Sequence, residues 1–414
     1  MLQKNKSSSK DELKPYLKAQ NIQPTGIDLS VIDNMWFSPD EKNKLLLKNN
    51  DVLISEGGDV GRSAIWQGQL VECYIQNAIN RARAIKGNST YFLNYWMVYL
   101  KSADFINTLC NKATIAHYTA EKVEASPLLL PNSDEQLQIS LFLEHETAKI
   151  DNLIDKQQQL IELLKEKRQA VISHAVTKGL NPDVPMKDSG VEWLGKVPEH
   201  WSIKSYRYAC LIYRGKFGHR PRNDPSLYDG DYAFIQTGDV ARASKFIETY
   251  SQTLNEKGKA VSQLFPSGTL MMAIAANIGD TAILGFEAYA PDSVVGFKPY
   301  QSLHLEFLRY SFMAALPALE QTSTQSTQAN LNIDRIGAVK AVFPPLEEQL
   351  DIIDYLDDKL CLYDSIEENA NQTIRLLQER RTALISAAVT GKIDVRDWAA
   401  PDMQDAEEPQ ETTA

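Results

Sequence analysis

Residues 131–179 read PNSDEQLQISLFLEHETAKIDNLIDKQQQLIELLKEKRQAVISHAVTKG, and residues 344–392 read PPLEEQLDIIDYLDDKLCLYDSIEENANQTIRLLQERRTALISAAVTGK. The two segments align without a gap at an offset of 213 residues, with 19 identities over 49 positions. A repeat of this length indicates a duplicated architecture. Weaker similarity extends upstream, where residues 16–22 resemble residues 234–240. We therefore expect two related halves, each ending in one of these segments.

Both repeated segments have the pattern of a long amphipathic helix. In the first, apolar residues recur every three or four positions, and neither Gly nor Pro occurs between Asp134 and Val176. An unbroken helix of ~43 residues is ~65 Å long at ~1.5 Å per residue. Such a helix must bury its apolar stripe on a partner helix, and the second segment supplies one of matching length. We therefore expect the two helices to pair.

The regions before the helices are predicted to mix helices and strands. Residues 270–274 and 281–284 are short apolar runs separated by a turn sequence at 277–280, which predicts a hairpin, and residues 307–316 have helical character. The predicted fold class is α+β, with two mixed α/β domains separated by two long antiparallel, coiled-coil-like helices in a pseudo-two-fold repeat. The predicted boundaries are 1–131 for the first domain, 132–180 for the first helix, 181–190 for a linker, 191–343 for the second domain, 344–392 for the second helix and 393–414 for an acidic, disordered tail.

The charge of the chain is unevenly distributed. The 414 residues include 43 Lys and Arg against 54 Asp and Glu, a net charge of −11. An acidic total disfavours nucleic-acid binding, which depends on neutralising phosphates. However, residues 1–131 carry 15 basic and 13 acidic side chains and residues 191–343 carry 15 and 14, whereas residues 344–398 carry 6 and 12. Because the acidic surplus lies on the second helix and the tail, either mixed domain could present a local basic face.

Several kinds of active site are disfavoured by the sequence. The four cysteines (Cys73, Cys110, Cys210, Cys361) form no CxxC pair, and the six histidines have no metal-ligand spacing. Neither GxxxxGK[ST], GxGxxG nor the Asn/Asp-Pro-Pro-aromatic motif of amino-methyltransferases occurs. No apolar run reaches ~18 residues and no secretory h-region is visible, so we expect a cytoplasmic protein without a membrane span. These absences favour a protein without its own catalytic activity, metal or cofactor.

The repeated segments and the joint between the halves resemble the specificity subunits of type I restriction–modification systems. The helix openings at Pro131 with Glu135-Gln136, and at 343–349, resemble that family's "PLPPLxEQ" openings. The helix ends at 163–173 and 376–390 resemble its "LLxERRxALISAAVTG" closings. Residues 176–190, followed by Trp193-Leu194-Gly195 and by 197–201, resemble the family's lead into its second target-recognition domain.

The resemblance implies a non-catalytic, sequence-specific DNA-binding subunit. Each mixed domain would read one half of a bipartite site in double-stranded DNA, while the paired helices would set the spacing and dock the modification (methyltransferase) subunits. S-adenosylmethionine, ATP and Mg would belong to the modification subunits and to a restriction motor-nuclease subunit. One alternative is a truncated or decoy subunit that binds modification subunits without productive DNA recognition. Another, a self-contained methyltransferase, is disfavoured because the chain lacks a cofactor motif.

The two mixed domains differ at their beginnings. The first has no counterpart of residues 191–216, and Met1-Leu2-Gln3 falls where the segment after Gly215-Lys216 falls in the second. Members of the family usually carry a Gly-Lys just before such a Met-Leu-Gln. We therefore expect the first recognition domain to be truncated at its N-terminal side.

Candidate contacts follow from the chemistry of base readout, which uses Arg, Lys, Asn and Gln side chains that reach a groove. The predicted DNA-binding residues are Lys4, Lys6, Lys18, Asn21, Arg62, Arg81 and Arg83 in the first domain, and Lys216, His219, Arg220, Arg222, Gln236, Thr237, Arg242, Lys245, Gln325, Gln328 and Asn330 in the second. The predicted partner-binding residues on the helices are Glu135, Gln136, Leu164, Arg168, Glu348, Gln349, Leu377 and Arg381.

Overall fold

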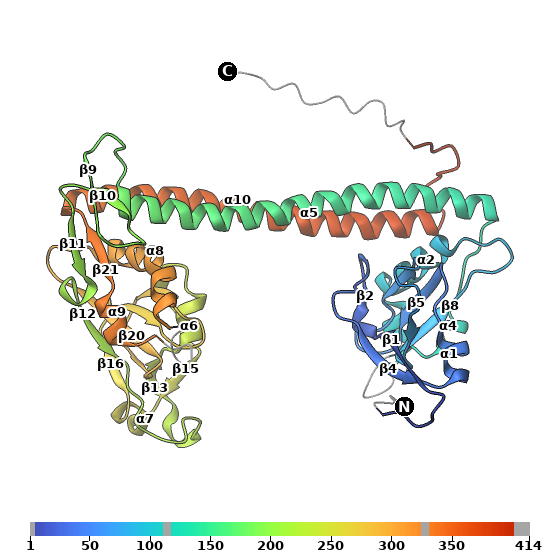
Figure 1. Cartoon of the computed structure of the whole chain (residues 1–414), viewed down its shortest axis with the longest axis horizontal. Helices are drawn as coiled ribbons and strands as arrows, with labels where there is room; N and C mark the ends of the chain where they lie inside the picture. Colours follow the sequence, from blue (N-terminus) through green and yellow to red (C-terminus); the bar gives the residue numbers. More distant parts are fainter. Residues whose placement is uncertain (1–4, 111–116, 324–330, 401–414) are drawn as a thin grey trace. The chain divides into compact units, whose positions relative to one another are not determined.

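The computed structural model describes residues 5–110, 117–323 and 331–400 (Figure 1). The chain divides into two compact units: unit 1 comprises Met1–Gln158 and Asn371–Ala414, and unit 2 comprises Gln159–Ala370. Each unit therefore contains one mixed domain together with part of each long helix. No helix among the described residues is both long and apolar enough to cross a membrane.

The two long helices are confirmed as α5 (Ser133–Lys178) and α10 (Leu346–Val389). Acidic residues occupy the first turn of each helix, where they interact favourably with the positive end of the helix dipole. Gly179 and Gly391, both with positive φ, follow the helix ends, where a glycine adopts this conformation without strain. The helices are antiparallel: Arg381 pairs with Asp151 at 2.9 Å in unit 1, and Arg168 pairs with Asp364 in unit 2.

Two larger sheets and the two-stranded sheets β10-β9 and β11-β21 lie in the mixed domain of unit 2. The five-stranded sheet has the order β12-β20-β17-β18-β14, and the four-stranded sheet has the order β15-β13-β19-β16. The predicted hairpin is confirmed, since β17 and β18 pair antiparallel with Leu270 opposite Ile283. The predicted helix at 307–316 is also confirmed, within the longer α8. The strands are β9 (Met186–Asp188), β10 (Lys196–Pro198), β11 (Ser202–Ser205), β12 (Cys210–Arg214), β13 (Tyr228–Phe234), β14 (Phe246–Ile247), β15 (Gln252–Leu254), β16 (Gln263–Phe265), β17 (Leu270–Ala273), β18 (Thr281–Leu284), β19 (Ala288–Ala290), β20 (Val294–Pro299) and β21 (Lys340–Phe343), and the helices are α6 (Thr237–Arg242), α7 (Glu256–Ala260), α8 (Leu305–Ser323) and α9 (Ile333–Ala338), with 3-10 turns at Tyr206–Tyr208 and Pro225–Leu227.

Unit 1 contains smaller sheets of related topology. Its sheets have the orders β4-β1-β7, β6-β5-β8 and β2-β3. The helix α2 contributes Phe92, Trp96 and Leu100 to the core of this unit. The elements are β1 (Glu12–Leu17), a 3-10 turn (Ala19–Asn21), β2 (Ile22–Gln23), β3 (Gly26–Ile27), β4 (Asp33–Phe37), α1 (Pro39–Leu45), β5 (Asp51–Ser55), β6 (Ser63–Trp66), β7 (Tyr74–Ile75), β8 (Ile79–Ala82), α2 (Thr90–Ser102), α3 (Phe105–Cys110) and α4 (Ala120–Glu124).

A buried glutamine fastens the first turn of each long helix to its own unit. In unit 2, the side chain of Gln349 accepts from His304 N at 2.7 Å and donates to the carbonyls of Ser302 and Pro344, both at 2.9 Å. In unit 1, Gln136 accepts from Ser89 N at 2.9 Å and donates to Asn88 Oδ1 and Pro131 O. The two glutamines stand 213 residues apart, so the repeat has preserved the same clamp.

The segment after α10 packs onto unit 1. Val395 is buried, and Trp398 makes an edge-to-face contact with Phe142 at a centroid distance of 5.5 Å. Gln138 on α5 also donates to the carbonyl of Trp398. The prediction of disorder from residue 393 onward is therefore wrong for 393–398, because apolar side chains in this acidic segment find a partner on α5.

Candidate nucleic-acid interface

A cleft of about 490 Å³ opens in unit 2 beside the end of β13, and we call it the unit 2 cleft. Aromatic rings and polar groups line it together, among them one carboxylate, that of Asp229, and the combination of rings with polar groups is suited to contact with nucleotides. Two of the predicted DNA-binding residues, Arg222 and Gln236, meet in this cleft. Its other polar or aromatic lining residues are Phe217, Asn223, Tyr228, Asp229, Phe234, Gln252 and Ser293.

Two glutamines form a hydrogen-bonded pair in the unit 2 cleft. Gln236 Nε2 donates to Gln252 Oε1 from the neighbouring strand β15. This bond uses neither the amide oxygen of Gln236 nor the amide nitrogen of Gln252, so the pair retains an acceptor oxygen on Gln236 and N–H donors on both residues. Sequence reasoning missed Gln252. The signal that identifies it is the strand register, in which Phe234, two residues before Gln236, lies opposite Gln252.

The predicted basic loop of unit 2 converges on Asp292. Arg222 Nη2 lies 2.7 Å from this carboxylate and Arg220 Nη2 lies 3.7 Å from it, while both guanidinium groups remain about half exposed. Arg214 adds a third cation, since its Nε donates to the carbonyl of Asp292 at 2.8 Å. Lys216 is exposed at the start of the loop. Asp292 therefore gathers three guanidinium groups, two at its carboxylate and one at its backbone carbonyl, without removing them from solvent.

His219 takes part in holding the shape of the same loop. Its Nε2 lies 2.9 Å from Asp224 Oδ2. Hydrogen bonds from Ser226 lower the pKa of the Asp224 carboxyl, and His219 lowers it further. Asp224 is thus ionised at neutral pH and can accept from both partners.

The remaining predicted DNA-binding residues of unit 2 differ in their exposure and in whether they already have a partner within the unit. Arg242 is two-thirds exposed and pairs with Asp239 within α6, and Thr237 is half-buried at the start of that helix. Lys245 lies 2.6 Å from both Glu306 and Asp357. Burial alone would lower the pKa of Lys245, but its hydrogen bonds to these two carboxylates raise it overall. The ammonium group of Lys245 is thus already paired with two anions of its own unit, and its contact with DNA stays a prediction.

Unit 1 has a counterpart of the glutamine pair at matching strand positions. In unit 1, β1 pairs with β4 so that Tyr16 lies opposite Asp33, as Phe234 lies opposite Gln252 in unit 2. Lys18 stands two residues after Tyr16, as Gln236 stands two residues after Phe234, and Lys18 forms an ion pair with Asp33. The two units therefore place a linked pair of polar side chains at the same position, amide with amide in unit 2 and cation with anion in unit 1.

Two of the predicted DNA-binding residues of unit 1 use their side chains in hydrogen bonds within the unit. Asn21 is buried, accepts from Lys18 N and donates to the carbonyls of Asp28 and Val31. Every polar group of the Asn21 side chain thus serves a turn, and its role in DNA binding stays a prediction. Arg81 likewise donates to the carbonyls of Leu46 and Lys44.

Three other cationic side chains of unit 1 remain at least partly exposed to solvent. Arg83 binds the buried carboxylate of Asp51 and is 38% exposed. Arg62 donates to Gln23 at 3.1 Å and lies 3.3 Å from Asp59. Lys6 is exposed and its ammonium lies 5.3 Å from the ring centre of Trp36. Lys4, Gln325, Gln328 and Asn330 lie outside the described residues.

The helix residues predicted to bind partners divide into two groups. Gln136, Gln349 and Leu164 are buried within their own units, and their contact with partners stays a prediction. Arg168 and Arg381 link α5 to α10 through Asp364 and Asp151, and Leu377 is half-buried on α10. Glu348 accepts from the indole of Trp201, and Glu135 lines a pocket together with Arg396, with which it interacts electrostatically.

The comparisons with known proteins agree with this architecture. The sequence model of the type I restriction modification DNA specificity domain matches residues 2–163 and again residues 215–376. The specificity subunit of the type I restriction enzyme EcoBI from Escherichia coli is 22% identical over 342 residues, which cover 77% of this chain and 69% of that protein. The specificity subunit of StySPI from Salmonella potsdam is 21% identical over 415 residues, covering 95% of this chain and 85% of that protein.

Solved structures share the fold. A structure from work on complex assembly and conformational transition of the type I R-M system aligns with a TM-score of 0.72 at 16% identity, covering 93% of each chain. The HsdS subunit from Thermoanaerobacter tengcongensis aligns with a TM-score of 0.50 at 16% identity, covering 93% of this chain and 92% of that one. Since the family model accounts for most of the chain, in two copies separated by the offset of the repeat, the chain belongs to the family of type I restriction–modification DNA specificity subunits.

Proposed function

We propose that unit 1 and unit 2 each read one half of a bipartite site in double-stranded DNA. The observation that carries this proposal is the matched position of the Lys18–Asp33 and Gln236–Gln252 pairs. A duplicated domain that keeps the position of a polar pair but changes its chemistry is expected to bind two different sequences in the same manner. The basic loop of unit 2 would contact phosphates beside its reading position, which orients the domain on the duplex.

The chemistry of each pair suggests a base for each half-site. An amide donor and acceptor held together match adenine, which offers N7 as acceptor and N6 as donor in the major groove. A lysine matches the acceptors O6 and N7 of guanine, and a carboxylate accepts from N4 of the paired cytosine. We infer that Gln236–Gln252 favours an A·T pair and that Lys18–Asp33 favours a G·C pair.

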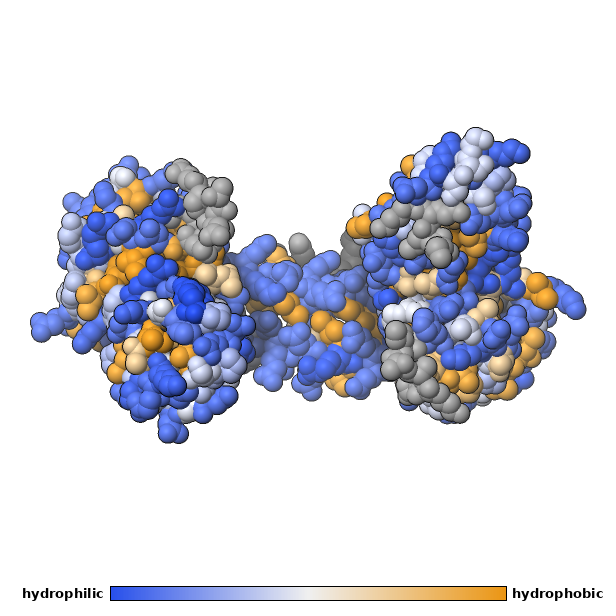
Figure 2. Space-filling view, turned by 90° about the horizontal axis from the view of Figure 1, so that it is seen from below, coloured by the Kyte–Doolittle hydropathy of each residue, from blue (hydrophilic) through white to orange (hydrophobic). Residues whose placement is uncertain are grey.

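The helices would fix the separation of the half-sites and dock the modification subunits. Leucines at equivalent positions of the repeat are exposed on both helices: Leu137 and Leu350 are 56% and 43% exposed, and Leu163 and Leu376 are 61% and 56% exposed. Apolar side chains are visible on the surface of the helices among polar ones (Figure 2). Exposed leucines repeated in this way suit two copies of one partner.

The catalytic chemistry would be carried by the partners of this chain. In this proposal the modification subunits hold S-adenosylmethionine and methylate adenine, and a restriction motor-nuclease subunit uses ATP and Mg. This chain would supply the sequence preference and the geometry of assembly. Its own contribution to the methylation rate is then the positioning of DNA against the modification subunits.

The test is to map methylated adenines in the genome of cells that express this chain with its modification subunits. A motif of two defined half-sites separated by a fixed number of unspecified base pairs is the expected result. A second candidate function, a decoy that binds modification subunits without productive DNA recognition, is favoured by one observation, the exposed apolar edge of unit 1 at residues 128–130. A stable complex that leaves no methylated motif would establish the decoy instead.

A further inference from the structure

In unit 1, the segment that follows β7 lies beside the reading position proposed for Lys18. The strands β1 and β7 are parallel, with Tyr16 opposite Tyr74. The backbone amide of Gln76 continues this pairing, since it donates to the carbonyl of Leu17 at 3.4 Å. Because side chains alternate along a strand, Lys18 and Gln76, each two residues beyond the tyrosine pair, extend from the same face of the sheet. Gln76 therefore stands next to Lys18 on the adjoining strand.

Unit 2 has the same arrangement of strands. There β13 and β19 are parallel, with Phe234 opposite Tyr289. This register aligns residues 72–79, ECYIQNAI, with residues 287–294, EAYAPDSV. The segment after β19 contributes Ser293 to the lining of the unit 2 cleft. The segment after β7 is therefore the equivalent part of unit 1, and its side chains are candidates for the same use.

The two units carry different chemistry at this equivalent place. Gln76 and Asn77 stand where unit 2 has Pro291 and Asp292. In unit 2, the carboxylate of Asp292 holds two guanidinium groups by charge. A side-chain amide has no charge with which to hold them, but it offers both a donor and an acceptor. Unit 1 therefore presents neutral hydrogen-bonding groups where unit 2 presents arginines.

A cleft of about 380 Å³ opens at this place, and we call it the unit 1 cleft. Gln76 and Asn77 line it together with Glu41 and Lys44 of α1. The carboxylate of Glu41 already accepts from the backbone amide and the hydroxyl of Ser38, at 2.9 and 2.8 Å. Lys44 is exposed, and its ammonium group has no ion-pair partner among the residues that the structure describes. The cleft thus combines two amides with a cation that can face an anionic backbone.

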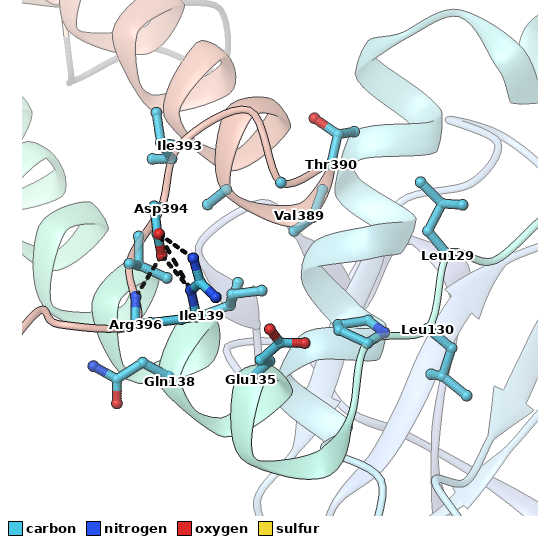
Figure 3. A pocket seen from close by; sticks show the side chains of 14 residues that line it. Leu129, Leu130, Glu135, Gln138, Ile139, Val389, Thr390, Ile393, Asp394 and Arg396 are labelled. Carbon is cyan, nitrogen blue, oxygen red and sulfur yellow. Dashed lines mark hydrogen bonds and ion pairs between the residues drawn. The ribbon is translucent and has the colours of Figure 1, made fainter.

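A second groove of unit 1 differs in its charges. It has a volume of about 460 Å³, and its charged lining residues are Glu135, Asp394 and Arg396 (Figure 3). Arg396 pairs with Asp394 at 2.6 Å and also interacts with Glu135, so two carboxylates share one cation. An acidic balance disfavours contact with the phosphates of DNA. This groove is therefore less suited to DNA than the unit 1 cleft.

The turn that carries the two amides is held by its backbone, while the amides themselves are uncommitted. Ile79 N donates to the carbonyl of Gln76 at 3.1 Å, and Glu56 N donates to the carbonyl of Ala78 at 2.9 Å. Gln76 is half-buried and Asn77 is exposed, and neither side chain has a hydrogen-bond partner within the described part of the chain. A turn that is already ordered loses little freedom when its side chains bind.

We propose that Gln76 is a specificity-determining residue of unit 1 and reads an adenine next to the base pair contacted by Lys18. Its Nε2 donates to N7 of the adenine, and its Oε1 accepts from N6, the pairing that a glutamine makes in the major groove. This inference rests on the proposed reading of DNA by unit 1. It adds a second residue and a second base pair to that half-site.

The test maps methylated adenines for the unaltered chain, Gln76→Ala and Gln76→Glu, each assembled with the same modification subunits. Gln76→Ala should relax one position beside the position that Lys18→Ala relaxes, with a loss of about tenfold in discrimination for adenine. Gln76→Glu keeps an acceptor but loses the donor. It should therefore change the preference at that position from adenine to cytosine, whose N4 donates to a carboxylate. A residue that only supports the fold would not produce this exchange of one base for another.

Gln67→Ala is the matched control, because Gln67 is an exposed glutamine of unit 1 outside the cleft, and it should leave the motif unchanged. A bipartite motif for the unaltered chain that neither Gln76 variant alters would overturn this inference and leave the proposed function in place. A change in the other half of the motif, or the same change with Gln67→Ala, would overturn it equally. The absence of a bipartite motif for the unaltered chain would overturn the proposed function, and this inference with it.

Discussion

A chain carrying both Leu163→Asp and Leu376→Asp should fail to retain modification subunits while keeping its own fold. Both leucines are more than half exposed, so their replacement removes little from the core and is expected to change stability by about 0.5 kcal/mol or less. In a complex, however, each aspartate would be buried without a partner in an apolar contact, at a cost of about 2 kcal/mol or more. That cost corresponds to a weakening of about 30-fold at each site.

The stoichiometry of the complex gives the sharper readout. Each single variant should retain one modification subunit in place of two, since the leucines occupy equivalent positions of the repeat, and the double variant should retain none. The masses of the purified complexes measure this directly. Gln158→Asp on α5 adds the same charge without removing an exposed leucine, so it should leave both copies in place. A double variant that still holds two subunits would show that these leucines do not dock them.

Replacing Trp201 by Ala should lower the free energy of unfolding of unit 2 by about 3–5 kcal/mol. The indole is almost fully buried, lies against Gly179 at the end of α5 and donates to Glu348 at the start of α10. The substitution opens a cavity in the largest core of the protein and removes one donor from a carboxylate. It therefore weakens the joint between the sheet and both helices.

Urea unfolding followed by circular dichroism measures this loss. Trp193→Ala, in the same segment, is the matched control because its ring is only half-buried and its indole donates to the carbonyl of Lys340 at 3.1 Å. We expect a clearly smaller loss for Trp193→Ala. If the two variants lost equal stability, or if Trp201→Ala lost less than about 1 kcal/mol, the role given to Trp201 would be wrong, since large losses of this kind arise from cavities in a packed core.

The helices and their pairing could be predicted because they depend on local patterns. Helical periodicity over the repeated segments predicted α5 and α10. The hairpin of β17 and β18 followed from two apolar runs around a turn. Each of these signals lies within a few residues of the element it predicts, so no tertiary information is needed.

The candidate site could be predicted only in part, because the availability of a side chain depends on tertiary contacts. Lys245 is a plausible DNA contact by residue type, yet Glu306 and Asp357, far along the chain, already bind its ammonium group. Gln252 shows the reverse case, since only the register of β13 and β15 brings it to Gln236. Residue type gives the chemistry of a group, whereas the fold decides whether that chemistry is already used.

The glutamines in the first turns of the two long helices show the same limit of prediction from sequence. Gln136 and Gln349 stand out in the sequence because the repeat preserves them, and preservation alone cannot separate a partner contact from an internal clamp. The structure assigns them to the clamp, where each amide satisfies backbone groups at a helix start that would otherwise be buried unpaired. The Leu137–Leu350 and Leu163–Leu376 pairs, which lie on the surface, are better candidates for docking.

The central claim is that the two units read separate halves of one DNA site. Its most direct test maps methylated adenines for three chains, each assembled with the same modification subunits: the unaltered chain, Lys18→Ala and Gln236→Ala. Loss of a base contact removes about 1–3 kcal/mol of discrimination at one base pair. We expect Lys18→Ala to relax one position in one half of the motif and Gln236→Ala to relax one position in the other half only. Changes by both variants within the same half, or a single continuous motif for the unaltered chain, would contradict the account.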